Sequence, residues 1–187
     1  MQGKIILLGL ILLITALGGQ IPQSVKTEVT QSILGNSLEG SPAQNPQPDF
    51  YPVVRAVDGD TIVVHINGVD EKIRLIGVDT PESVDPRKPV QCFGKEASQF
   101  TASLLDHKNV RLEIDTAQGE RDKYQRLLRY VFLEDGTLLN KKIIADGYGH
   151  EYTYKIPYQH QQEFKAAQNE ARIQKRGLWA DGACVKN

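Results

Sequence analysis

The chain has 187 residues, of which 40% are hydrophobic and 24% are charged, and its formal net charge is −1. This composition is ordinary for a globular protein and leaves enough apolar residues for one domain with a core. Two of the 22 basic and three of the 23 acidic residues precede Phe50, so the rest of the chain carries 20 of each. The balance excludes a strongly electropositive surface, and any contact with nucleic acid must depend on local charge placement.

Residues 1–18 are predicted to be a signal peptide. Lys4 supplies a positive charge, residues 5–17 are almost uninterruptedly apolar, and small residues precede a candidate cut before Gly19. The apolar run is short for a transmembrane helix, which needs about 20 such residues. The expected location is therefore secreted or periplasmic, and the alternative is an uncleaved membrane anchor through residues 4–19.

Residues 19–49 are polar, rich in Gln, Ser, Pro, Gly and Asn, and poor in aromatic residues. A segment of this kind cannot bury enough surface to fold alone, so we expect a flexible linker. The folded domain is expected to span residues 50–187. It contains no internal repeat, no protein partner is predicted, and a monomer is the default expectation.

The domain opens with β-branched residues that predict three successive strands, at Tyr51–Val57, Thr61–Ile66 and Glu71–Ile76. A turn at residues 58–60 separates the first two. Asn67-Gly68 then predicts a tight hairpin, because both residues tolerate a positive φ. Further along the chain, two more strands are predicted at Val110–Ile114 and Leu127–Leu133.

Three helices are predicted between and after these strands. Helical spacing of apolar residues indicates one at Phe93–His107, a second is expected at Leu139–Asp146, and a third opens at Pro157 and stops at Gly177. Five strands with three helices predict an α+β fold. The expected architecture is a five-stranded β-barrel of the oligonucleotide-binding type, an OB-fold-like barrel with three α-helices.

Cys92 and Cys184 are the only cysteines of the chain. Export would permit a disulfide between them. The loop that it would close covers most of the domain, and such a cross-link stabilises by about 4–5 kcal/mol in the chain-entropy model. The alternative is a pair of unpaired thiols.

Carboxylates gather at the end of the predicted hairpin. Asp60 opens one strand and Asp79 lies just past the end of its partner, so an antiparallel pairing brings the two together. Two carboxylates there would suit a hard cation such as Ca²⁺. The alternative is that both are turn residues, since Asp is common in turns.

Three more residues complete a candidate catalytic set. Glu82 follows Pro81 in the next loop and could take a proton from a metal-associated water. Arg74 on the incoming strand, and Arg126 before the last strand, could each grip two phosphate oxygens. Taken singly, each is more typical of a surface acid or an ion pair, but together they indicate metal-assisted phosphodiester cleavage.

These motifs resemble the staphylococcal nuclease (thermonuclease) family over roughly residues 53–179. The matching elements occur in the order Val57-Asp58-Gly59-Asp60-Thr61, Arg74 through Glu82, Gly94-Lys95-Glu96-Ala97, Asp122-Lys123-Tyr124-x-Arg126 and Tyr152-x-Tyr154. The resemblance implies a five-stranded barrel with three helices. It also implies calcium-dependent hydrolysis of DNA and RNA phosphodiester bonds that leaves 3′-phosphate ends.

The resemblance further implies a role for each matching residue. Asp60 and Asp79 would bind Ca²⁺ through their carboxylates and Thr80 through its backbone carbonyl, and Glu82 would assist or activate the attacking water. The remaining roles fall to residues that would contact the substrate: Arg74 and Arg126 at the scissile phosphate, Lys123 and Tyr124 at a terminal phosphate, and Tyr152 and Tyr154 along the nucleotide pocket, where stacking tolerates any base.

Two features depart from the family pattern. Gln125 stands where the family commonly has Gly, which puts the shape of the loop before Arg126 in doubt, and the domain is neutral where the best-known members are basic. The alternative function is a non-catalytic nucleic-acid-binding module on the same barrel. A calcium-binding structural domain would leave both arginines unexplained. The four histidines show no zinc-ligand spacing.

Overall fold

The structure is a computed structural model that describes residues 49–83 and 89–184. These residues lie in one compact unit that runs from Pro48 to Asn187. The predicted signal peptide lies outside the described residues, and so does the predicted linker except for Asp49. Within the described part of the chain, no helix is both long enough and apolar enough to span a membrane.

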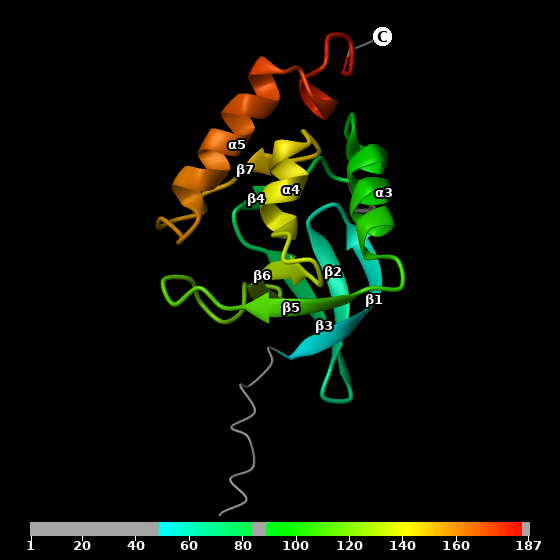
Figure 1. The fold of residues 1–187 in the computed structure, drawn as a ribbon, viewed down its shortest axis with the longest axis vertical. Coiled ribbons are helices and arrows are strands. Elements are labelled where there is room, and N and C mark those ends of the chain that lie inside the picture. The colour runs from blue at the N-terminus through cyan, green and yellow to red at the C-terminus, as the bar shows by residue number, and fades with distance from the viewer. Residues whose placement is uncertain (1–48, 84–88, 185–187) are drawn as a thin grey trace, which may run out of the picture. The chain divides into compact units, whose positions relative to one another are not determined.

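Five strands close into a barrel, as the sequence predicted (Figure 1). Around the barrel the order is β1-β2-β3-β6-β5, and every neighbouring pair is antiparallel except β3 and β6, which run parallel. The strands are β1 (Phe50–Asp58), β2 (Thr61–Ile66), β3 (Val69–Leu75), β5 (Asn109–Glu113) and β6 (Leu127–Leu133). This confirms the OB-fold-like α+β architecture.

The β2–β3 hairpin sets the register on which the rest of the domain depends. Asn67 and Gly68 both have positive φ, 49° and 85°, which matches the right-handed twist of the flanking strands. The pairing then runs from Ile66 opposite Val69 to Thr61 opposite Arg74. Asp60, just before β2, is thereby brought beside the end of β3.

Of the three α-helices in the described residues, α3 (Gly94–Leu105) and α4 (Leu139–Ala145) pack against the barrel, and α5 (Gln161–Ile173) packs against α4 (Figure 1). A short 3-10 helix, η1 (Gly177–Trp179), follows α5. The core is built from strand and helix side chains that are fully buried, with Tyr130 and Phe164 the largest among them. The buried amide of Asn140 in α4 is paired: it accepts the Val131 N–H at 2.9 Å and donates to the Ile76 carbonyl at 2.9 Å.

The predicted bounds of the third helix are wrong at both ends. The helix begins at Gln161 rather than Pro157, because Asp115 accepts the N–H of Gln159 at 2.8 Å and holds this segment in turns. It ends at Ile173, before Lys175 takes the left-handed conformation with φ 53°.

Gly177, the predicted helix stop, instead lets two backbones approach each other. A Cβ built on Gly177 would lie 2.4 Å from the carbonyl oxygen of Gly147. The N–H of Leu178 donates to that same oxygen at 2.8 Å. The glycine is therefore required by a tertiary contact of η1 and not by the end of α5.

A second, two-stranded sheet was not predicted. It pairs β4 (Val78–Asp79) with β7 (His150–Glu151), with Asp79 opposite His150. Each strand has two residues, too few for any alternation of polar and apolar side chains to show. The sheet joins the segment after the hairpin to the segment that carries Tyr152 and Tyr154.

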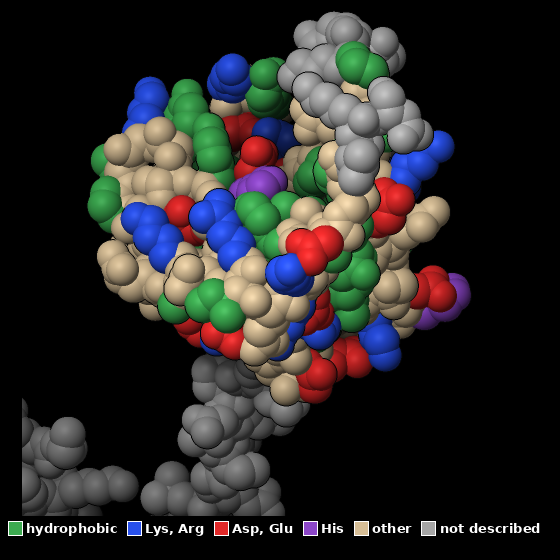
Figure 2. Space-filling view, turned by 90° about the horizontal axis from the view of Figure 1, so that it is seen from above, with side chains coloured by type: hydrophobic (Ala, Val, Ile, Leu, Met, Phe, Trp, Pro, Cys, Tyr) green, Lys and Arg blue, Asp and Glu red, His purple; other side chains and the backbone are tan. Residues whose placement is uncertain are grey.

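Charges of both signs are interspersed on the face seen in Figure 2, which views the domain from the upper end of Figure 1. Lys and Arg side chains lie among Asp and Glu side chains instead of forming a single basic patch there. This distribution agrees with the neutral balance of the domain.

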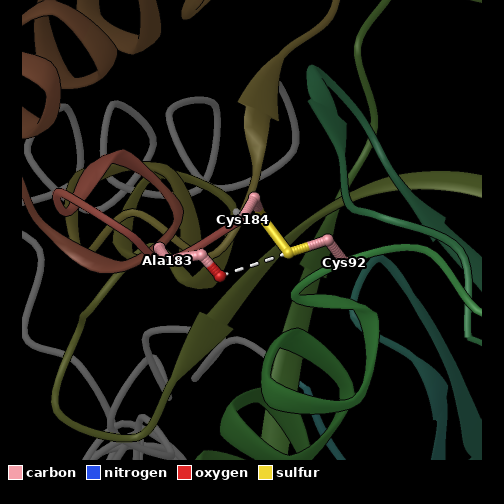
Figure 3. Close-up of a disulfide and its surroundings, with 3 residues drawn as sticks. All are labelled: Cys92, Ala183 and Cys184. Atoms are coloured by element: carbon pink, nitrogen blue, oxygen red, sulfur yellow. Dashed lines mark hydrogen bonds between the residues drawn. A yellow bond between two sulfur atoms is a disulfide. The ribbon is translucent and has the colours of Figure 1, made fainter. Parts of the chain in front are cut away.

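The disulfide Cys92–Cys184 is present, and it joins the segment before α3 to the C-terminal segment (Figure 3). The two Cα atoms are 5.7 Å apart, and 92 positions of sequence separate the residues. The carbonyl oxygen of Ala183 lies 3.3 Å from Cys92 Sγ. Because a disulfide sulfur carries no proton, we describe this last approach as a contact and not as a hydrogen bond.

Candidate active site

The hairpin builds the acidic part of the site. Asp60 is buried in the turn before β2, and its carbonyl oxygen accepts the N–H of Leu75 at 3.0 Å. Its carboxylate oxygen Oδ2 lies 3.1 Å from Arg74 Nη2. Asp79 Oδ1 lies 3.2 Å from that same nitrogen. The two carboxylates that the sequence placed at the hairpin end therefore converge on one guanidinium.

Arg74 is held by four acceptors, two on each terminal nitrogen. Besides the two carboxylates on Nη2, its Nη1 donates to the carbonyl oxygens of Leu75 at 3.0 Å and Val78 at 2.5 Å. The side chain is only 14% exposed. Its orientation is fixed by the backbone turn after β3 as well as by the acids.

Burial, together with neighbouring acids, raises the pKa of two carboxyls in this region. Partial desolvation, together with the charge of Asp60, raises the pKa of Asp79, and the guanidinium of Arg74 opposes the change. Burial also raises the pKa of Asp58, although hydrogen bonds from Ser83 and from the Gly59 N–H act against it. Concentrated negative charge of this kind favours the binding of a cation.

The donor atoms fit a hard cation such as Ca²⁺, because they are all oxygens. Thr80 lies directly beside Asp60, since its backbone N–H donates to Asp60 Oδ2 at 3.1 Å. Its buried hydroxyl oxygen has no hydrogen-bond partner among the described residues. A Cβ added to Gly59 would meet that oxygen at 2.7 Å, so only glycine leaves Thr80 room there. The three candidate ligand residues, Asp60, Asp79 and Thr80, thus lie next to one another.

Glu82 lies in the loop after β4, and its backbone is clasped on both sides by one residue. The N–H of Glu82 donates to Gln91 Oε1 at 2.9 Å, and the N–H of Gln91 donates to the Glu82 carbonyl at 2.9 Å. The Glu82 side chain is half-buried, and its hydrogen bond with Asp58 and its charge near Asp79 each help to raise the pKa of those carboxyls. The predicted general base therefore belongs to the same cluster of acids.

Arg126 is oriented by the carboxylate of Asp122. Its Nε lies 2.7 Å and its Nη2 2.6 Å from Asp122 Oδ2, so two guanidinium nitrogens contact one carboxylate oxygen. The second oxygen of Asp122 accepts the backbone N–H of Arg126 at 3.0 Å. Arg126 Nη1 also reaches the hydroxyl of Thr61 at 3.3 Å, and this hydroxyl donates to Asp60 at 2.9 Å. Thr61 thereby connects the second arginine to the acidic part of the site.

The loop before Arg126 requires a left-handed residue. Gln125 has a φ of 66°, a conformation that glycine adopts freely and that costs an ordinary L-residue about 1–2 kcal/mol. Its N–H donates to the Asp122 carbonyl at 3.0 Å, and its own carbonyl accepts from Arg121 at 2.7 Å. These contacts hold Gln125 in the strained conformation.

The predicted substrate-binding residues are exposed around the site. Tyr124 is 63% exposed, and its ring lies 4.9 Å from Lys123 Nζ and 5.3 Å from Arg126 Cζ. Tyr152 and Tyr154 are 43% and 66% exposed, with ring centroids 6.4 Å apart. The Lys123–Tyr124 pair thus adjoins the second arginine.

The two tyrosines of the other pair are attached to the site through the backbone. The N–H of Tyr152 donates to the Gly77 carbonyl at 3.0 Å, between β3 and β4. The structure therefore brings Arg74, Asp60, Asp79 and Glu82 together directly, whereas Tyr152 and Tyr154 flank them.

Four supporting residues of the site received no role from the sequence: Thr61, Ser83, Gln91 and Asp122. Only Asp122 had a local signal, since Asp is common in turns, where its side chain accepts a backbone N–H two residues further on, here that of Tyr124. The contacts of Gln91 and Ser83 span 9 and 25 residues of sequence, and no periodicity reveals such pairs.

The fold and the site together define an OB-type barrel protein with an oxygen-lined acidic centre flanked by two arginines. Residues 72–181 match the family model described as "Staphylococcal nuclease homologue". The chain belongs to the staphylococcal nuclease family, as its motifs indicated.

Similar proteins include thermonucleases of two staphylococci. The thermonuclease of Staphylococcus hyicus is 41% identical over 137 residues, which are 73% of this chain and 79% of that protein. For the thermonuclease of Staphylococcus intermedius the identity is 42% over 131 residues, 70% and 76% of the two chains. Endonuclease YncB of Bacillus subtilis (strain 168) is 34% identical over 151 residues, which cover 79% of this chain and 71% of that one.

Proposed function

We propose that this protein is an exported, calcium-dependent nuclease that hydrolyses phosphodiester bonds of DNA and RNA and leaves 3′-phosphate ends. Membership of the family, with relatives named as thermonucleases and an endonuclease, supports a nuclease. The observation that carries the proposal is the convergence of Asp60 and Asp79 on Arg74, with Arg126 connected to them through Thr61.

Asp60 and Asp79 would hold the calcium ion through their carboxylates, and Thr80 would contribute its carbonyl oxygen. When bound, Ca²⁺ would supply positive charge that polarises the scissile phosphate and favours deprotonation of the attacking water. The buried hydroxyl of Thr80 and the charge concentrated on these acids support a cation at this place. Calcium also accepts the mixture of carboxylate and carbonyl oxygens that this loop offers.

Glu82 would accept a proton from the water that attacks phosphorus. Arg74 and Arg126 would donate N–H groups to the phosphate oxygens, on which negative charge builds up in the pentavalent transition state. The two contacts of Asp122 Oδ2 with the Arg126 guanidinium support this role, because a guanidinium whose orientation is already fixed loses little entropy on meeting phosphate. Its Nη1 and Nη2 each carry a second N–H that can face the substrate.

Lys123 and Tyr124 would contact a terminal phosphate, and Tyr152 and Tyr154 would line the nucleotide pocket. Their exposure supports this, since a stacking platform must be open to solvent before the substrate binds. Stacking on tyrosine does not distinguish the sugar or the base, which fits the use of both DNA and RNA. With a neutral domain, affinity would depend on these few contacts.

Export is supported by the disulfide, because such bonds persist in oxidising compartments, and by the apolar N-terminal segment of the sequence. The protein would be secreted or periplasmic, or stay anchored through residues 4–19 if that segment is not removed. A monomer with no protein partner suffices for the proposed chemistry.

The test is degradation of single-stranded DNA by the purified chain, with Ca²⁺ and then with EGTA, alongside Glu82→Ala. We expect cleavage that requires calcium and falls strongly in the variant while the fold is retained. Glu170→Ala on the exposed face of α5 is the matched control and should cleave normally. No cleavage by a folded protein would favour the alternative, a non-catalytic nucleic-acid-binding module on the same barrel, and full activity of Glu82→Ala would refute the role of that residue.

A further inference from the structure

Gln91 makes two hydrogen bonds with the backbone of Glu82. Gln91 accepts the Glu82 N–H on its side-chain oxygen and donates its own N–H to the Glu82 carbonyl, both at 2.9 Å. Two hydrogen bonds to one residue fix both the position and the direction of its backbone. The Glu82 side chain projects from that backbone, so the point from which its carboxylate extends is held by a residue nine positions further along the chain.

The start of α3 reinforces this arrangement. The N–H of Gly94 donates to the Gln91 carbonyl at 3.0 Å, and a Cβ built on Gly94 would lie 2.7 Å from the Glu82 carbonyl oxygen. Glu82 and Gln91 are therefore packed directly against the first turn of the helix. Any shift of the segment 91–94 would move the Glu82 backbone with it.

Cys92, the next residue after Gln91, carries the disulfide to Cys184 (Figure 3). Both cysteines are exposed, so a small reductant can reach the bond. The C-terminal segment that holds Cys184 is itself fixed at its other end, where Leu178 donates to the Gly147 carbonyl at 2.8 Å. The disulfide thus connects the clasp on Glu82, by which we mean the two hydrogen bonds between Gln91 and the Glu82 backbone, to a segment that is anchored independently.

The same C-terminal segment also contacts the strand pair that carries Asp79. Trp179 packs edge-on against His150 with 5.0 Å between ring centroids, and His150 pairs with Asp79 between β7 and β4. Arg172 of α5 covers the Trp179 ring at 4.3 Å. One segment therefore supports the candidate general base through the disulfide and a candidate metal ligand through a small sheet.

We propose that Gln91 is a positioning residue for Glu82, and that the Cys92–Cys184 disulfide keeps Gln91 in place, so that turnover depends on the oxidation state of the protein. This inference rests on the proposed nuclease function. A dithiol would reduce the bond by transferring two electrons and two protons to the two cysteines, and would itself become a disulfide. The nuclease would then be less active before oxidation than after it.

The first arm of the test compares two substitutions of equal length. Gln91→Met removes the acceptor for the Glu82 N–H, whereas Gln91→Glu keeps an oxygen there. With single-stranded DNA and saturating Ca²⁺, we expect Gln91→Met to lower kcat by about tenfold to a hundredfold with KM unchanged, because misplacement of a catalytic group affects the transition state. Gln91→Glu should recover most of the turnover. Gln162→Met, at an exposed glutamine of α5, is the matched control.

The second arm is reduction of the full chain with a small dithiol below its melting temperature, with circular dichroism as the check on folding. We expect a fall in kcat similar to that of Gln91→Met, and little further loss when Gln91→Met itself is reduced. Unchanged kcat in the reduced, folded protein overturns the role of the disulfide. Unchanged kcat in Gln91→Met overturns the role of Gln91, and this variant decides the question even if the reduced protein unfolds.

Amide hydrogen exchange at Glu82 provides a readout that needs no catalysis. Exchange should be slow in the oxidised protein and faster both after reduction and in Gln91→Met, because the hydrogen bond that protects this N–H is weakened or lost. If the oxidised protein shows no calcium-dependent cleavage, the proposed function fails while the exchange data still test the clasp. Equal exchange in all forms overturns the positioning role.

Discussion

Asp115 and Asp79 are residues of the same type, but their carboxylates lie in opposite surroundings. Asp115, after β5, is 6% exposed and accepts three hydrogen bonds, from Tyr130 Oη at 2.6 Å and from the backbone N–H groups of Gln159 and Ala117, both at 2.8 Å. Asp79 has a side chain that is 54% exposed and shares one arginine nitrogen with Asp60. The carboxylate of Asp115 is satisfied by neutral donors, whereas Asp60 and Asp79 place two negative charges on the single guanidinium of Arg74.

The pKa values move in opposite directions as a result. Burial alone would raise the pKa of Asp115, but its hydrogen bonds outweigh burial and the pKa lies below its ordinary value. Desolvation and the charge of Asp60 raise the pKa of Asp79. A carboxylate whose oxygens are satisfied contributes to the fold, whereas one left with uncompensated charge is available to a ligand.

The largest expected effect comes from removing the charge of Asp79. Asp79→Asn should lower the affinity for Ca²⁺ by about a hundredfold or more and turnover by a comparable factor, since a ligand charge is lost. Without calcium, its unfolding free energy should not fall, because ionisation of a carboxyl with a raised pKa is unfavourable in the folded state. Calorimetry with Ca²⁺ and urea unfolding test both points, and a large loss of stability would contradict the comparison.

Substitutions of the two arginines should differ in their effect on the affinity for calcium. Arg74→Gln and Arg126→Gln are each expected to lower kcat on the order of 10²–10³-fold, since each removes charge stabilisation from the transition state. Arg74 also contacts both candidate metal ligands, so its loss should strengthen Ca²⁺ binding measured by titration. Arg126 is paired with Asp122, and its variant should bind calcium as the wild type does. Equal calcium affinity in both variants would contradict this distinction.

Asp115 predicts an acid-sensitive contribution to stability. Its folded pKa lies below the unfolded value of 3.8, so its contribution is present in full above about pH 4 and is lost as the pH falls through the folded pKa. Asp115→Asn should lower the unfolding free energy by about 1–3 kcal/mol at pH 7, because the amide group cannot accept from all three donors. Urea unfolding between pH 7 and pH 3 should show a smaller pH dependence in this variant, with calcium affinity unchanged.

The smallest expected effect concerns the loop before Arg126. Gln125→Gly removes the strain of a left-handed residue, and we expect it to raise the unfolding free energy by about 0.5–1 kcal/mol. Turnover should stay close to that of the wild type, because Asp122 still holds Arg126. Thermal unfolding measures the change, and destabilisation would show that the Gln125 side chain has a role that its backbone conformation does not explain.

The sequence by itself determined the barrel and the centre of the site. Strand patterns and the Asn67-Gly68 hairpin are local signals, and an antiparallel hairpin fixes which residues face each other, so Asp60 and Asp79 could be placed close to each other in advance. The motifs also indicated the family. These predictions depended on residues close together in the sequence or on one register.

Only the tertiary structure decided the supports of that site. The link from Arg126 through Thr61 to Asp60, the clasp of Gln91 on Glu82 and the pairing of β4 with β7 join residues that no local pattern relates. The start of α5 at Gln161 and the true role of Gly177 likewise followed from contacts with distant segments. Local propensity selects strands and turns, but the hydrogen bonds that orient the candidate catalytic side chains form only after the barrel has closed and brought its loops together.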